Sequence, residues 1–210
     1  MTVSGTLRMM LVFLAASWTA PVKEVGASEA TDRAIEVVQS LAADIWSAPK
    51  LASADERKPY LAKAIASRTN VDMISRLALG RHWRSFDETL RRDYQELFSQ
   101  VIIGDLAGRL DLLIGDLSGS LDQHFEINGG VSAGKRDIVV RSKVIDENGQ
   151  TFSVDWRLRD MDGDPAIIDL VIEGVSLIVT QRAEFSSVIE RRRPEGLIAV
   201  LRDRAKAESL

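Results

Sequence analysis

The sequence predicts an α+β fold in which N-terminal helices and closing C-terminal helices pack around an antiparallel sheet of about four strands. Apolar residues of the first half recur every three or four positions, which is the spacing of an amphipathic helix. In the second half, apolar and polar residues alternate between turns rich in glycine and aspartate, which is typical of an antiparallel sheet with one buried face. We therefore expect the helices to cover that face.

The first 27 residues carry the pattern of a secretory signal peptide. Arg8 gives a weakly positive start, residues 7–16 form an apolar run, and small residues provide two possible cleavage sites, after Ala27 or after Ala30. The run is too short to span a bilayer, and no later run approaches the required length. We expect export to the periplasm and a single domain over residues 31–206. Because the sequence has no cysteine, this domain depends on its apolar core for stability.

Three helix starts are predicted in the first half. Thr31, Asn70 and Ser85 are residue types that cap helices, and Glu88 completes a capping box with Ser85. Gly80 stands where the second of these helices ends. The expected inward residues are Ile35, Val38, Leu41 and Ile45; Val71, Ile74, Leu77 and Ala78; and Leu90, Tyr94, Leu97, Phe98 and Val101.

Four strands are predicted at 125–127, 138–145, 151–159 and 166–173, with intervening turns at 128–130, 148–149 and 162–164. In the third strand, apolar residues alternate with polar ones, so that one face is dry and the other wet. The dry face comprises Phe152, Val154, Trp156 and Leu158, continued by Ile168, Leu170 and Ile172. Ser176 then caps a helix that reaches about Glu190, and Pro194 begins another.

Motifs that would indicate an enzyme are incomplete. Residues 129–136 resemble a phosphate-binding loop, but Arg136 replaces the required serine or threonine, and the segment joins two strands, so we interpret it as a hairpin loop. Ser176 resembles a catalytic serine, but Ile178 replaces the second glycine of that motif. With two histidines and no cysteine, no metal site is expected.

The charged residues suggest solvated surfaces. The net charge of −4 argues against nucleic-acid binding. Carboxylates such as Asp155 and Asp169 fall on the wet face, where arginines can pair with them. Arg191, Arg192 and Arg193 either attract anionic lipid headgroups or complement the end of a helix.

Several segments together resemble the MlaC family: Leu-Gly-Arg-His-Trp at 79–83, Asp-Trp-Arg-Leu-Arg at 155–159, and the stretches 169–176 and 181–185. The resemblance implies a twisted sheet wrapped by helices, with a deep apolar pocket for phospholipid acyl chains. It also implies a periplasmic carrier, which we expect to be a monomer because the sequence has no heptad seam, that moves phospholipids between two partners. These are an outer-membrane lipoprotein–porin complex and an inner-membrane ABC transporter with MCE domains. Pro165 and Ala166 replace a tryptophan usual in the family, which puts the cargo in doubt.

On this resemblance and the alternation, we predict that twelve residues line the pocket: Ile74, Leu97, Val101, Val154, Trp156, Leu158, Ile168, Leu170, Ile172, Val175, Leu177 and Phe185. The expected cargo is phospholipid, with no other cofactor, no metal and no catalytic residue. Three alternatives stay open: a hopanoid or other lipid carrier of the same family, an adaptor without ligand, and an enzyme. An enzyme would need Asp155 or Asp169 to point inward, whereas alternation places both outward.

Overall fold

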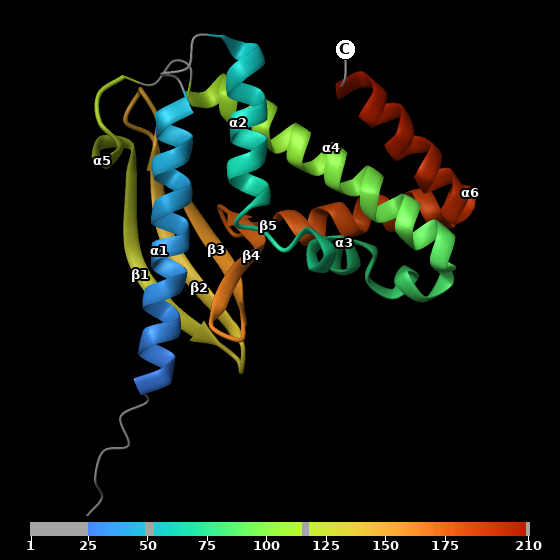
Figure 1. Cartoon of the computed structure of the whole chain (residues 1–210), viewed down its shortest axis with the longest axis horizontal. Coiled ribbons are helices and arrows are strands. Elements are labelled where there is room, and N and C mark those ends of the chain that lie inside the picture. Colours follow the sequence, from blue (N-terminus) through green and yellow to red (C-terminus); the bar gives the residue numbers. More distant parts are fainter. Residues whose placement is uncertain (1–24, 49–52, 115–117, 209–210) are drawn as a thin grey trace, which may run out of the picture.

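The computed structural model describes residues 25–48, 53–114 and 118–208 (Figure 1). The elements follow in this order: α1 (Val25–Ser47), α2 (Ala54–Ala66), α3 (Val71–Leu79), the 3-10 helix η2 (Gly80–Ser85), α4 (Glu88–Ile114), α5 (Leu121–His124), β1 (Phe125–Ala133), β2 (Asp137–Ile145), β3 (Thr151–Met161), β4 (Asp164–Ile172), β5 (Val175–Ser176) and α6 (Leu177–Glu208). Residues 1–24 of the predicted signal peptide lie outside the described residues. Both predicted cleavage sites fall within α1.

The strands form one open antiparallel sheet in the order β1-β2-β3-β4-β5. The predicted α+β class is confirmed, and the estimate of four strands falls short only by the two-residue β5. Glu173 and Gly174 both have positive φ (49° and 78°), which is the backbone of a tight hairpin turn, and this turn brings β5 back beside β4.

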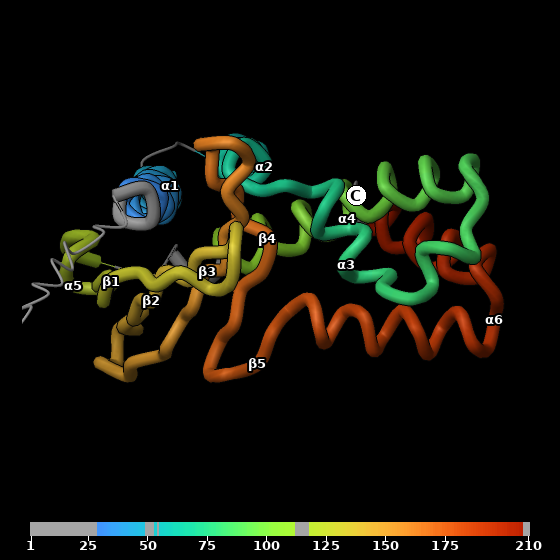
Figure 2. The backbone as a smooth tube through the Cα atoms, turned by 90° about the horizontal axis from the view of Figure 1, so that it is seen from below, coloured from blue at the N-terminus to red at the C-terminus, as the bar shows by residue number. Residues whose placement is uncertain are grey.

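The helices cover one face of the sheet and extend beyond its edge. Figure 2 shows α1 and α2 on one side of the sheet, while α3, η2, α4 and most of α6 form a helical lobe next to β4 and β5. The core is correspondingly divided into two clusters. One lies between the sheet and α1, α2 and α4, and the other lies within the helical lobe. Because α4 contributes to both clusters, it joins the two halves of the fold.

Three predicted helix boundaries are confirmed. The Asn70 side chain accepts a hydrogen bond from the Met73 amide (2.9 Å) at the start of α3, and Gly80 ends that helix with φ 54°. Ser176 Oγ accepts from the Val179 amide (3.1 Å) at the start of α6. The two helices predicted around Pro194 are the two segments of α6, which bends at Arg193 (φ 61°).

Two predicted caps are wrong. Thr31 lies inside α1, which begins earlier. Ser85 is the last residue of η2, and its hydroxyl donates to the His82 carbonyl (2.7 Å) instead of capping α4. Asp87 is the cap, since its carboxylate accepts from the Leu90 amide (2.8 Å). A carboxylate at this position also favours the positive end of the helix dipole.

The turn predicted at 128–130 is wrong as well. β1 continues through these residues with a shift of register against β2, and the chain reverses only at 134–136. Gly129 has a positive φ of 93°, and a Cβ added at Gly130 would lie 2.7 Å from Thr31 Cγ2 of α1. The glycines therefore form a bulge that lets a helix pack closely, and the loop-like segment 129–136 belongs mostly to β1.

The wet face of the sheet is stabilised by one buried carboxylate. Asp137, only 6% exposed, accepts hydrogen bonds from Arg159 Nε (2.6 Å to Oδ1) and from Arg157 Nε (2.9 Å to Oδ2). Both arginines lie on β3, two residues apart and therefore on the same face. The hydrogen bond from Arg159 is the main reason why the pKa of Asp137 is lowered.

We expect Asp137→Asn to lower the free energy of unfolding by about 1–3 kcal/mol at neutral pH, because two guanidinium groups lose their charged acceptor. Since folding depresses the pKa of Asp137, its contribution is present above the ordinary aspartate range and is lost as the pH falls below about 4. Urea titrations across that range should therefore show a weaker acid dependence for the variant. Asp155→Asn is the control, because Asp155 lies on the same face of β3 as Arg157 and Arg159. Equal acid dependence of wild type and Asp137→Asn would contradict the assignment.

Candidate functional site

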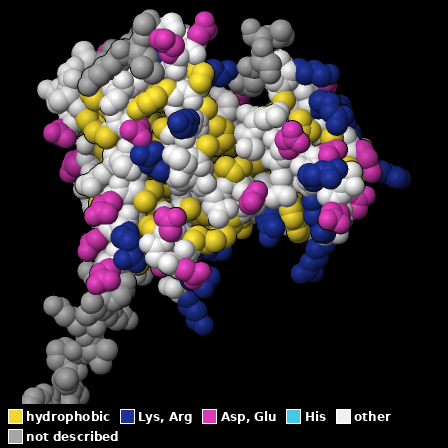
Figure 3. Space-filling view, in the orientation of Figure 1, with side chains coloured by type: hydrophobic (Ala, Val, Ile, Leu, Met, Phe, Trp, Pro, Cys, Tyr) yellow, Lys and Arg dark blue, Asp and Glu magenta, His cyan; other side chains and the backbone are white. Residues whose placement is uncertain are grey.

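The most extensive apolar region lies between the sheet and the helices above it, and we call it the apolar layer. It is formed by fifteen buried residues: Ala34, Val38, Leu41, Ala48, Leu61, Ala64, Ile65, Ile103, Ala107, Ile138, Val140, Val154, Trp156, Leu158 and Ile167. Figure 3 shows this side of the molecule, where apolar side chains gather over α1, α2 and the sheet, and charged side chains crowd the helical lobe. The layer is the place where an apolar ligand could be bound.

The helical side of the apolar layer is rich in small residues. Ala34 and Ala48 on or next to α1, Ala64 on α2 and Ala107 on α4 are all buried in it. An alanine removes little apolar surface from water compared with leucine or phenylalanine. Separating these helices from the sheet therefore costs less per residue than opening a core of large interlocking side chains, which suits a layer that admits a ligand.

The buried polar atoms of the sheet are satisfied within the sheet itself. Trp156 Nε1 donates to Ser142 Oγ (2.9 Å), and Ser142 Oγ donates to the Val154 carbonyl (2.9 Å). The Trp156 ring also meets Phe125 edge to face, with centroids 6.4 Å apart. Because Ser142 and Trp156 are on adjacent strands, this chain of hydrogen bonds needs no partner from the helices.

Charged pairs surround the layer and connect helices to one another. Arg57 of α2 pairs with Asp111 of α4 at 2.6 Å, and this hydrogen bond raises the pKa of Arg57. Arg68, which follows α2, pairs with Asp44 of α1, also at 2.6 Å. These ion pairs connect the three helices to one another. The surfaces of the helices that face the sheet stay apolar.

The structure divides the twelve predicted lining residues among four environments. Val154, Trp156 and Leu158 are in the apolar layer, and Leu170 packs against it. Four others belong to the cluster of the helical lobe: Ile74, Leu97, Val101 and Phe185. Ile168 is fully buried but belongs to neither cluster, whereas Ile172, Val175 and Leu177 are exposed.

A bulge in β4 explains why Ile168 leaves the dry face. The pairing with β3 shifts between Arg157 and Leu158, so that Ile167 lies opposite Leu158 while Leu170 stays opposite Trp156. Ile167 therefore occupies the position in the apolar layer that alternation had assigned to Ile168. The alternation of apolar and polar residues cannot tell which of the two lies in the apolar layer, because both residues are isoleucines.

The apolar face reaches solvent at one edge of the sheet. Ser142, Val154, Ile172 and Val175 are paired in succession across β2, β3, β4 and β5. Their exposed fractions rise along this row, from 2% and 8% to 39% and 58%. The buried apolar surface is thus continuous with an exposed apolar edge, formed by Ile172 and Val175 with Leu177 beside them, and we call this edge the β4–β5 rim.

The carboxylate that an enzyme would need does not face the layer. Asp169 accepts hydrogen bonds from the Ser176 hydroxyl (2.6 Å) and from the Ile178 amide (3.1 Å), so it holds the start of α6. Within the described ranges, no group of three or more His, Asp or Glu residues is arranged to hold a metal ion. None of the described helices is long and apolar enough to cross a membrane.

Two open hollows on the surface, of about 680 and 440 Å³, lie outside the apolar layer and are lined mostly by polar residues. The layer and its exposed edge remain the best candidate for a binding function. The fold is thus an open sheet with a helical cover, an internal apolar layer and an exposed apolar edge.

Residues 31–203 match the model of the MlaC protein family, and the chain belongs to this family. A solved structure with the same fold is that of a phospholipid-binding protein from Ralstonia solanacearum, determined in complex with a phospholipid. The two chains are 23% identical and superpose with a TM-score of 0.69, and the match covers 86% of this chain and 99% of the other. The family predicted from the sequence segments is therefore confirmed.

We expect Ser142→Ala to lower the free energy of unfolding by about 1–3 kcal/mol, because the buried Trp156 N–H loses its acceptor. The same substitution in a Trp156→Phe background should cost less, since no buried indole N–H remains. Urea unfolding of the four proteins in this cycle measures the coupling, which should exceed about 0.5 kcal/mol. Ser153→Ala, at an exposed position of β3, is the control; additive effects of the two substitutions would show that the hydrogen bond contributes nothing.

Proposed function

We propose that this protein is a periplasmic carrier that binds phospholipid and moves it between the outer and inner membranes. Membership of the MlaC family supports this proposal, as does the fold shared with a phospholipid-binding protein of Ralstonia solanacearum. We propose no catalytic step, because the candidate carboxylate Asp169 serves the helix start and the site offers apolar side chains.

The observation that carries the proposal is the continuity between the apolar layer and the β4–β5 rim. A carrier has to take acyl chains from a membrane without exposing them to water. The row from Val154 through Ile172 to Val175 provides apolar surface all the way from the interior to solvent. We propose that acyl chains enter across this rim and separate the helices from the sheet as they move inward.

The energetics of such a carrier follow from its apolar interior. Burying one methylene contributes about 0.8 kcal/mol, so two acyl chains of about 16 carbons exposed to water would cost on the order of 25 kcal/mol. Transfer from bilayer to protein exchanges one apolar environment for another, so the net change is small and the transfer is reversible. The charged headgroup stays at the surface, since a buried phosphate without partners is prohibitive.

Direction and energy have to come from other proteins if transfer is reversible. We propose that the carrier collects or delivers lipid at an outer-membrane lipoprotein–porin complex and at an inner-membrane ABC transporter with MCE domains. The predicted signal peptide supports a periplasmic location for this exchange. The resemblance of residues 129–136 to a phosphate-binding loop gives no support for a nucleotide site, because most of this segment is part of β1.

We expect the protein purified from periplasm without detergent to carry about one phospholipid per chain, because the apolar layer is the one lipid site proposed. Native mass spectrometry gives the stoichiometry, and organic extraction identifies the lipid. Protein stripped of lipid and then incubated with liposomes is the matched control and should reload. A hopanoid would keep the carrier and change its cargo. Protein that stays bare after both treatments would contradict lipid binding and favour an adaptor role.

We expect Val175→Asp to slow lipid uptake from liposomes by about tenfold or more, because acyl chains would have to pass a charge at the β4–β5 rim. Val175 is 58% exposed, so the free energy of unfolding should change little. Val131→Asp is the control: this valine is 42% exposed and lies on the opposite edge strand, β1. Fluorescent-lipid transfer measures the rates. Equal rates for the two folded variants would place the entrance elsewhere.

A further inference from the structure

Helix α4 belongs to both clusters of the core, and the change from one cluster to the other falls in the middle of the helix. Its first half, residues 88–102, contributes Tyr94, Phe98 and Val101 to the cluster of the helical lobe. Its second half, residues 103–114, contributes Ile103 and Ala107 to the apolar layer. If acyl chains separate the helical cover from the sheet, the second half of α4 has to move while the first half stays in the lobe.

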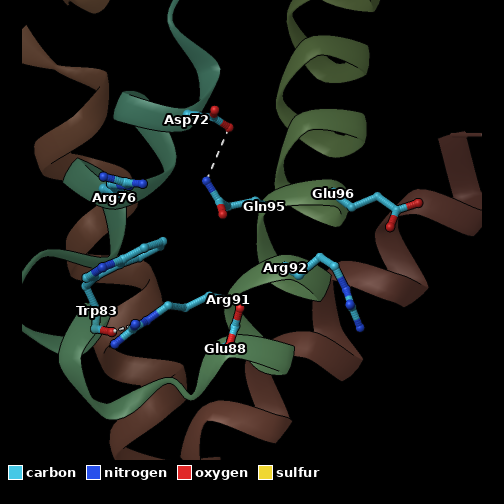
Figure 4. Close-up of a pocket in the computed structure, with 8 residues that line it drawn as sticks. All are labelled: Asp72, Arg76, Trp83, Glu88, Arg91, Arg92, Gln95 and Glu96. Carbon is cyan, nitrogen blue, oxygen red and sulfur yellow. Dashed lines mark hydrogen bonds between the residues drawn. The ribbon is translucent and has the colours of Figure 1, made fainter.

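The first half of α4 is attached to α3 and η2 by hydrogen bonds and by stacking. Figure 4 shows Gln95 donating to Asp72 (3.2 Å between Nε2 and Oδ1), and Arg91 Nε donating to the Trp83 carbonyl (3.2 Å). The guanidinium carbon of Arg91 also lies 5.2 Å from the centre of the Trp83 ring, where the cation is attracted to the face of the indole. These contacts hold the outer side of this half in place.

Large aromatic side chains hold the same half inside the lobe. The Tyr94 ring centre lies 5.7 Å from that of Phe86 and 6.0 Å from that of Phe185, in both cases edge to face. The buried Tyr94 hydroxyl donates to the Ser75 carbonyl (2.9 Å). Displacing this half would separate the aromatic rings and leave a buried hydroxyl without its acceptor. The first half of α4 is therefore the fixed part of the helix.

The second half of α4 is attached to the helical cover. Its ion pair between Asp111 and Arg57 (2.6 Å) leads to α2, which is another helix over the sheet. Toward the sheet it presents apolar side chains, among them Ile103 and Ala107. A movement of this half together with α2 would keep the ion pair and exchange apolar contacts only. The two halves of one helix are therefore bound to different parts of the fold.

Two glycines lie where the first half of α4 meets the second. Gly104 directly follows Ile103, and Gly108 comes one turn later. Neither has a positive φ, so the backbone conformation does not require glycine at these positions. A Cβ added at Gly108 would meet nothing within 4 Å, so close packing does not require glycine there either. A glycine inside a helix costs stability relative to alanine, and glycine is one of the residues at which helices bend.

We propose that α4 bends at Gly104 and Gly108 when lipid enters, so that its second half moves away from the sheet together with α1 and α2. This inference rests on the proposed function and names the residues that set the rate of lipid uptake. A hinge needs a few positions that absorb a change of φ and ψ, and glycine offers the least resistance to such a change. The hydrogen bonds and aromatic contacts of the first half are kept, so the lobe has the same structure with and without lipid.

The test compares wild type with Gly108→Ala and Gly108→Ser, each purified from periplasm and stripped of lipid. We expect Gly108→Ala to slow the uptake of a fluorescent phospholipid from liposomes by about fivefold, which corresponds to the difference in helix propensity between glycine and alanine. Gly108→Ser should slow it by about twofold, because the helix propensity of serine is intermediate. The thermal unfolding midpoint of Gly108→Ala should rise by about 2–4 °C, since the added methyl group has room. The final amount of bound lipid should be unchanged.

Thr89→Ala is the matched control. Thr89 is exposed in the first half of α4, and its replacement by alanine also raises helix propensity. We expect this variant to gain stability and to take up lipid as fast as wild type. Uptake by Gly108→Ala at the wild-type rate would overturn the proposal. Equal slowing by Thr89→Ala would overturn it too, because general stabilisation would then explain the effect.

Amide hydrogen exchange measures the bending of α4 without lipid. We expect residues 103–111 to exchange about tenfold or more faster than residues 92–101 in wild type, and Gly108→Ala to slow the exchange of 103–111 by about fivefold. Equal exchange of the two segments in wild type would overturn the proposal. Absence of lipid uptake in wild type and all variants would contradict the proposed function. Faster exchange of 103–111, slowed by Gly108→Ala, would still support the bend in that case.

Discussion

The apolar face of the sheet is the constraint on which the rest of this structure depends. Alternation on β3 places Val154, Trp156 and Leu158 on one side, and such a surface has to be removed from water. The helices α1, α2 and α4 provide the cover. At the bulge in β1, α1 approaches so closely that a Cβ at Gly130 would lie 2.7 Å from Thr31 Cγ2, so the cover requires a glycine there.

The cover is incomplete at one edge of the sheet. β5 has only two residues, and the chain leaves the sheet there to form α6 in the helical lobe. Ile172 and Val175 consequently continue the apolar face without a helix over them. Asp169 fixes this arrangement, because its carboxylate binds both the Ser176 hydroxyl and the Ile178 amide at the point of departure. The exposed rim is therefore a consequence of topology.

Local chemistry made much of the fold predictable, and longer-range packing explains the errors. Asn70 and Ser176 cap helices as predicted, because a side chain that satisfies the first amides is a local property. Ser85 failed because Asp87 competes for the same role only two residues later. The replacement of Ile168 by Ile167 in the apolar layer depends on a bulge that no local pattern reveals.

The distribution of polar contacts indicates how the apolar layer can open without loss of the fold. The hydrogen bonds of Ser142 and Trp156 stay within the sheet, so lifting the helices would leave these two donors paired. The Arg57–Asp111 pair joins α2 to α4, and Arg68 joins the end of α2 to α1, so these helices can move as one unit. The sheet holds that unit at the end of α2, where Ile167 exchanges two backbone hydrogen bonds with residues 68 and 70. In the proposed entry at the β4–β5 rim, an acyl chain would replace apolar contacts with apolar contacts, and the hydrogen bonds within the sheet and the ion pairs between the helices would be kept.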